Sequence, residues 1–135
     1  MTIKRFMISG ATAATILALA AFPALAAVGN QNPNLTVQLN LNPTVVTAPN
    51  QVTATGSITN NTRKTDRVTA EVEITSPSGA ASSYYQKYTI GAGQTVSQTN
   101  VYSVSADAER GTYTIVLSAT DKAGTSSATE YLTVQ

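Results

Sequence analysis

From Leu35 to the C-terminus, the apolar residues of this chain recur at every second position, which is the period of a β-strand. In residues 35–41, for example, leucine and valine alternate with threonine, glutamine and asparagine. Short turn signals rich in Gly, Asn, Asp, Ser and Pro separate the alternating stretches. The pattern predicts seven strands, at residues 35–41, 51–59, 68–75, 83–90, 95–104, 112–120 and 125–134. Pro43 and Pro49 bracket an irregular stretch in which Val45-Val46 is expected to be a short edge piece.

Seven short strands without a helical segment favour an all-β, seven-stranded immunoglobulin-like Greek-key β-sandwich. Its inner faces are expected to meet in a single core. The register of 95–104 stays open, because Val101 competes with Val96 and Tyr102 for the inner face. The expected core includes Leu39, Ile58, Val72, Tyr113, Ile115, Leu117 and Leu132.

The first 26 residues have the features of a secretory signal peptide, helical where it forms structure. Lys4 and Arg5 supply a basic start, residues 6–22 are apolar, and Ala24-Leu25-Ala26 is an A-x-A cleavage site. The alternative is a retained signal-anchor helix, although Ser9, Gly10, Thr12 and Thr15 weaken the apolar run. We therefore predict cleavage near Ala26, a flexible tail at 27–34, a sandwich domain at 35–135, and a secreted or periplasmic protein without a membrane span.

Cleavage would leave 109 residues with six basic and seven acidic side chains, a net charge of −1. Such a balance argues against nucleic-acid binding, which favours a basic surface. The chain has no cysteine, so the fold holds together without disulfides and carries no N-terminal cysteine for a lipid anchor.

The residue inventory also limits the chemistry that the chain can perform. It has no histidine and no cysteine, which excludes Ser-His-Asp and Cys-His nucleophilic sites and typical zinc or blue-copper centres. Glu71 and Glu73 are the nearest approach to a catalytic carboxylate pair, but they should point to solvent from one strand face. Asp107 and Glu109 lack the spacing of a calcium loop. We expect neither catalytic residues, nor a cofactor, nor a bound metal.

Two groups of tyrosines suggest further features, a sugar-binding surface and a stabilising turn. Tyr84, Tyr85 and Tyr88 together could form a sugar-stacking platform, whereas strand alternation favours burial of Tyr84 with Tyr88. Tyr113 follows Gly111 at the start of a strand, as in a tyrosine corner, where the hydroxyl bonds to the backbone across a loop. A plain core tyrosine is the alternative at that position.

Three stretches resemble a known family. The passage ITNNTRKTDRVTAEVEI resembles CARDB-like bacterial surface modules, as does GAGQTVSQTNVYSVSADAERGTYTI. LSATDKAGTSSATEYLTV resembles the last hairpin of bacterial immunoglobulin-like domains. The resemblance implies an extracellular structural or adhesive module, usually one of several in a long chain.

The leading functional hypothesis is a secreted, non-catalytic binding or structural module of the cell envelope or extracellular space. The alternatives are a carbohydrate-binding module and a subunit of a surface assembly, and self-association stays open. In an immunoglobulin-like sandwich the loops at 60–67 and 121–124 share one end. The sequence therefore predicts a binding pole for a protein or an anionic envelope polymer, made of Arg63, Lys64, Arg67, Asp121 and Lys122.

Overall fold

The computed structural model describes residues 3–4 and 31–135, and this part of the chain contains strands and no helix. The signal peptide prediction lies outside these residues, apart from Ile3–Lys4, which forms the short strand β1. No helix within the described ranges is long and apolar enough to cross a membrane. The other strands are β2 (Leu35–Asn42), β3 (Val45–Val46), β4 (Asn50–Asn60), β5 (Asp66–Thr75), β6 (Ala81–Ile90), β7 (Thr95–Val104), β8 (Gly111–Asp121) and β9 (Gly124–Val134).

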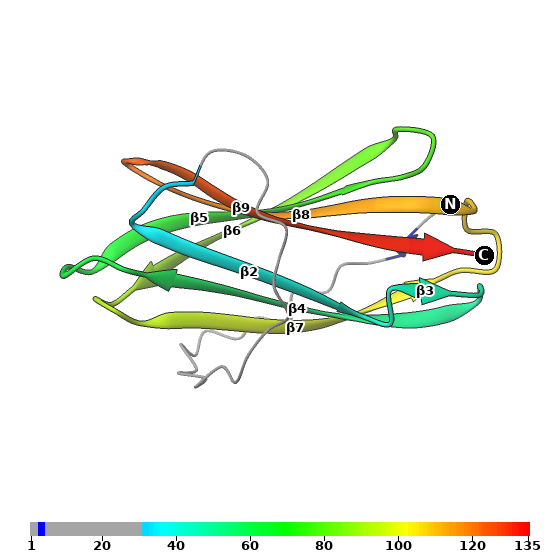
Figure 1. The fold of residues 1–135 in the computed structure, drawn as a ribbon, viewed down its shortest axis with the longest axis horizontal. Helices are drawn as coiled ribbons and strands as arrows, with labels where there is room; N and C mark the ends of the chain where they lie inside the picture. Colours follow the sequence, from blue (N-terminus) through cyan, green and yellow to red (C-terminus); the bar gives the residue numbers. More distant parts are fainter. Residues whose placement is uncertain (1–2, 5–30) are drawn as a thin grey trace.

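The strands form two sheets that lie face to face (Figure 1). One sheet has the order β1-β7-β4-β2, and the other has the order β3-β9-β8-β5-β6. The chain changes sheet between β4 and β5, between β6 and β7, and between β7 and β8, which gives the crossing connections of a Greek key. The short edge piece expected at Val45-Val46 is present as β3, and it pairs in parallel with the end of β9. The predicted immunoglobulin-like β-sandwich is confirmed.

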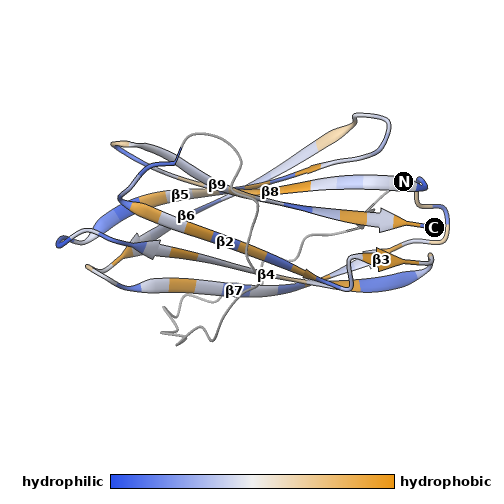
Figure 2. Ribbon diagram, viewed as in Figure 1, coloured by the Kyte–Doolittle hydropathy of each residue, from blue (hydrophilic) through white to orange (hydrophobic). Residues whose placement is uncertain are grey.

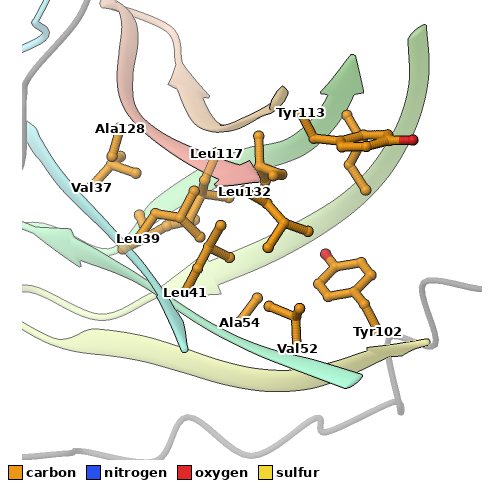
Figure 3. Packing of buried hydrophobic residues seen from close by; sticks show 14 of the residues in the cluster. Val37, Leu39, Leu41, Val52, Ala54, Tyr102, Tyr113, Leu117, Ala128 and Leu132 are labelled. Atoms are coloured by element: carbon orange, nitrogen blue, oxygen red, sulfur yellow. The ribbon is translucent and has the colours of Figure 1, made fainter. Parts of the chain in front are cut away.

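Hydrophobic positions recur along the strands of both sheets (Figure 2), and their side chains pack together between the sheets as the core (Figure 3). Six of the seven predicted core residues are buried. Val72 is the exception and is only half-buried, because it lies toward an open edge of the sandwich. The open register of β7 is also settled: Val96 and Tyr102 face the core, whereas Val101 is 52% exposed.

The two long sides of the sandwich differ. On one side β2 packs closely against β9, and the Ser126 hydroxyl lies 3.0 Å from the backbone oxygen of Leu35. Asn32 also belongs to this closed side, since its backbone N–H donates to Ser126 Oγ over 2.8 Å. The packed domain therefore includes Asn32, within the segment 27–34 that was expected to be a tail. On the other side, a cleft lies between β6, the edge strand of its sheet, and β7, which β1 borders only at Ser103 and Val104.

The predicted tyrosine corner is present at the start of β8. Tyr113 is almost fully buried, and its hydroxyl donates to the backbone oxygen of Glu109 over 2.8 Å. Gly111 allows this turn, because its φ of 125° lies in a region that side chains rarely adopt, and a Cβ there would lie 3.0 Å from Pro77. Burial, together with the nearby charge of Glu109, raises the pKa of Tyr113 to about 12.

Candidate functional site

The β4–β5 loop and the β8–β9 turn lie at the same end of the sandwich, as predicted (Figure 1). Arg63 and Lys64 are exposed in the loop, Arg67 is exposed at the start of β5, and Lys122 is exposed in the turn. The loop is also among the most hydrophilic parts of the ribbon (Figure 2). We call these four cations the basic end. Their binding role stays a prediction.

Asn60 fixes the loop that carries two of these cations. Its side chain is fully buried, and its Nδ2 donates to the backbone oxygens of Lys64, Ile90 and Gly91 over 2.8, 3.0 and 3.2 Å. Its Oδ1 accepts from the backbone N–H of Thr62 over 2.9 Å. One amide thereby ties the β4–β5 loop to the β6–β7 turn and holds Arg63 and Lys64 outward.

Asp121 performs the same task for the β8–β9 turn. This residue is buried, and its Oδ1 accepts from the backbone N–H groups of Ala123 and Gly124 and from Asn32 Nδ2. Asn34 Nδ2 lies 3.4 Å from the second carboxylate oxygen. The carboxylate that the sequence placed in the binding pole is thus engaged in fixing the turn, while its neighbour Lys122 points to solvent.

The carboxyl groups of Asp66 and Asp121 meet beneath the basic end, and their pKa values move apart. Burial and the hydrogen bond and negative charge of Asp121 raise the pKa of Asp66 above its usual range. Burial alone would also raise the pKa of Asp121, but hydrogen bonds from Ala123, Asp66 and the two asparagines outweigh it and lower that pKa. Asp121 therefore remains the charged member of the pair to a lower pH.

Lys87 extends the basic surface, and the sequence alone did not place it there. It lies on β6 opposite Thr69, two register steps from the pair Arg67 and Thr89, and these residues line a shallow depression on the outer face of the sheet. Its outward position follows from alternation, but its closeness to Arg67 depends on the β5–β6 pairing. The opposite end of the sandwich carries Asp107 and Glu109.

The other residues considered from the sequence have structural settings. Glu71 lies on β5 opposite Tyr85, and a hydrogen bond with Glu71 raises the pKa of the Tyr85 hydroxyl. Glu109 Oε2 accepts a hydrogen bond from Ser78 over 2.9 Å. Within residues 3–4 and 31–135, no group of three or more carboxylates is arranged to hold a metal ion.

Tyr84, Tyr85 and Tyr88 do not share one face. Tyr85 is 66% exposed on the outer face of β6, whereas Tyr84 and Tyr88 are half-buried and line the cleft between β6 and β7. Tyr88 crosses to the other sheet, where its hydroxyl donates to Gln98 Oε1 over 2.7 Å. The three rings therefore form no common platform.

The fold is that of a CARDB-like, immunoglobulin-type β-sandwich. The CARDB domain of a Pyrococcus furiosus protein, solved in complex with di-metal ions, has a TM-score of 0.60 and 16% identity. The match covers 86% of this chain and 100% of that domain. No protein-family model and no curated protein matches the sequence.

Similar sandwiches also occur inside larger enzymes. The Pseudomonas fluorescens alkylpurine DNA glycosylase AlkC, bound to DNA with an abasic-site analogue, has a TM-score of 0.62 and 10% identity over 78% of this chain. A Listeria innocua β-glucosidase in complex with isofagomine has a TM-score of 0.53 and 11% identity over 74% of this chain. This chain spans only 31% of the glycosylase and 16% of the glucosidase. These likenesses show the fold alone.

Proposed function

We propose that this protein is an exported, non-catalytic binding module that uses its basic end to hold an anionic polymer of the cell envelope. The observation that carries the proposal is the one-sided distribution of charge. Of the six basic residues in 27–135, four form the basic end and Lys87 lies beside Arg67. A protein of nearly zero net charge thereby presents a locally positive surface that attracts anions by Coulomb forces.

The hydrogen bonds beneath this surface support the proposal. Asn60 and Asp121 hold the two loops in place through buried side chains, so the cations extend from a rigid base. A rigid base lowers the entropy that is lost on binding. The acidic groups at this end contact each other, since Asp66 and Asp121 share a hydrogen bond, and the charge of Lys122 also acts on Asp66. Export is supported by the signal-peptide features of residues 1–26.

The test measures binding of the exported protein to immobilised polyglycerol phosphate across a salt series. Wild type should bind at low salt and be released as screening increases, because the contacts are between exposed charges. The triple variant Arg63→Ala, Lys64→Ala, Arg67→Ala should lose binding and keep its melting temperature. A matched control, Arg110→Ala, removes an exposed cation from the opposite end and should bind as wild type does. Equal binding by the triple variant would contradict the proposal.

A further inference from the structure

Three of the sheet edges in this sandwich are protected against pairing with another chain. Native proteins usually protect an edge with a short strand, a lysine, an inward-facing charge or a covering segment. In one sheet, the two-residue strand β3 covers the end of β9, Glu130 on β9 occupies an inward-facing position, and β6 carries the exposed Lys87. In the other sheet, β2 packs against β9, and Ser126 donates to the backbone oxygen of Leu35.

The edge formed by β7 has none of these features. Its ten residues include no charged side chain and no proline, and it pairs with β4 at ten consecutive positions without a bulge. Within residues 3–4 and 31–135, the only strand along its other edge is β1, whose Ile3 and Lys4 pair in antiparallel orientation with Val104 and Ser103. This edge therefore accepts an antiparallel strand, and cleavage near Ala26 would remove β1 from the exported protein. A long, uncharged and straight edge of this kind is a site for strand pairing.

The side chains of β7 fit a second copy of β7 in antiparallel orientation, with a two-fold axis at Thr99. On the outer face this register places Thr99 opposite itself, Ser97 opposite Val101, and Thr95 opposite Ser103. No like charges meet, and Val101, which is 52% exposed in a single copy, would be partly covered. Because the arrangement is two-fold symmetric, it closes as a dimer and does not continue as a fibre.

We propose that the exported protein forms a two-fold symmetric dimer in which β7 pairs with β7 of a second copy. The two sheets that contain β7, β4 and β2 then join into one continuous sheet. A second copy is the occupant that this edge favours, because the uncharged strand is complementary to itself.

The dimer would place the two basic ends far apart. β7 begins at the basic end, beside the β6–β7 turn that Asn60 holds through the backbone oxygen of Gly91. Antiparallel pairing therefore directs the two basic ends in opposite directions. This consequence rests on the proposed function: a dimer can hold two segments of an anionic polymer and gains avidity when both ends are engaged.

Sedimentation of the exported protein measures the pairing without any polymer, so its outcome is independent of the binding assay. Wild type should be a dimer at about 100 μM, about a hundred times a micromolar Kd, and should dissociate on dilution. Thr99→Lys places two lysines opposite each other and should weaken the dimer about tenfold, while circular dichroism shows an unchanged fold. Gln51→Lys adds the same charge to the outer face of the inner strand β4 and should dimerise as wild type does. A monomeric wild type at this concentration, or a Thr99→Lys dimer as tight as wild type, would overturn the proposal.

A single introduced cysteine tests the register, because the chain has no cysteine of its own. Facing residues of antiparallel strands have Cα atoms about 4.5–5.5 Å apart, which lies within the range that a disulfide spans. Thr99→Cys should therefore give a disulfide-linked dimer on mild oxidation, whereas Gln51→Cys should stay unlinked. No linkage at Thr99, or equal linkage at both positions, would reject pairing through the middle of β7.

Discussion

Individual polar side chains hold this sandwich together at places where the sequence shows only turn-forming residues. Asn60 and Asp121 stand at the ends of β4 and β8, where Asn and Asp are common because they favour turns. In the structure both are buried. Asn60 donates to the backbone oxygens of Ile90 and Gly91, and Asp121 accepts from backbone N–H groups of its own turn and from the side chain of Asn32. No pattern in the sequence distinguishes Asn60 from its exposed neighbour Asn61, whose amide donates to Pro33 and Thr36, because burial depends on how distant segments pack.

Asp66 and Asp121 are expected to affect the stability of the folded protein in opposite directions at neutral pH. The pKa of Asp121 is lowered in the folded state, so it contributes stability at neutral pH that is lost as the pH falls through the folded pKa. The pKa of Asp66 is raised, so its contribution is present in acid and is lost as the pH rises through its folded pKa.

At pH 7, therefore, Asp121→Asn should lower the melting temperature and Asp66→Asn should raise it. Both differences from wild type should shrink as the pH falls toward the acidic range in which carboxylates titrate. Melting curves recorded from pH 7 downward check this. If both variants shift the melting temperature in the same direction at pH 7, the two carboxyl groups do not interact as described.

Tyr113 allows a single hydrogen bond to be tested. Tyr113→Phe removes the hydroxyl that donates to Glu109 and keeps the buried ring. It should cost about 1 kcal/mol of unfolding free energy, measured in urea. Tyr131→Phe, a change at a ring that is 52% exposed, is the control and should change stability little. If Tyr113→Phe loses no more unfolding free energy than the Tyr131→Phe control, Tyr113 is a plain core tyrosine and its hydroxyl adds no stability.

At the scale of strands, alternation between turn signals predicted all seven main strands with ends within two residues of those observed, and the flanking prolines marked the short piece β3. The signal is strong because one face of nearly every strand is buried. It fails where a strand borders the open side, since Val72 and the inner face of β6 are only half-buried. It also cannot give pairing between strands, and this is why the closeness of Lys87 to Arg67 was missed.

A pair of truncations tests the packing of these strands. Leu117→Ala should destabilise the protein by about 2–5 kcal/mol, because it opens a cavity where Leu117 meets β4 close to Gly56. Val101→Ala should cost little, since that side chain points outward from β7. Chemical unfolding of both variants provides the measurement. A large loss at Val101 would mean that β7 faces the other way.

At the scale of the whole molecule, the two long sides of the sandwich differ in how tightly they close, and the two ends differ in charge. One side is sealed by β2 and β9, and the other is left open between β6 and β7. One end is basic, and the other carries Asp107 and Glu109. The sides and ends of a small sandwich can thus differ in chemistry while the fold stays the same.

The protein must be exported to meet the envelope polymer that we propose it binds. The A-x-A site predicts that the secreted protein begins at Ala27 and lacks residues 1–26. Intact mass spectrometry of the protein recovered from the periplasm or medium measures this. A mass that includes Met1 or the apolar run of residues 6–22 would favour the retained anchor.

The central claim, that the basic end is the surface that meets an anionic polymer, is tested most directly by residue-resolved NMR. Amide shifts of the ¹⁵N-labelled exported protein are followed during titration with polyglycerol phosphate. Perturbations should cluster in residues 61–67, 87–89 and 122–124, and should fade as salt is added. Perturbations centred on the opposite loops at 76–80 and 105–110, or none at low salt, would contradict it.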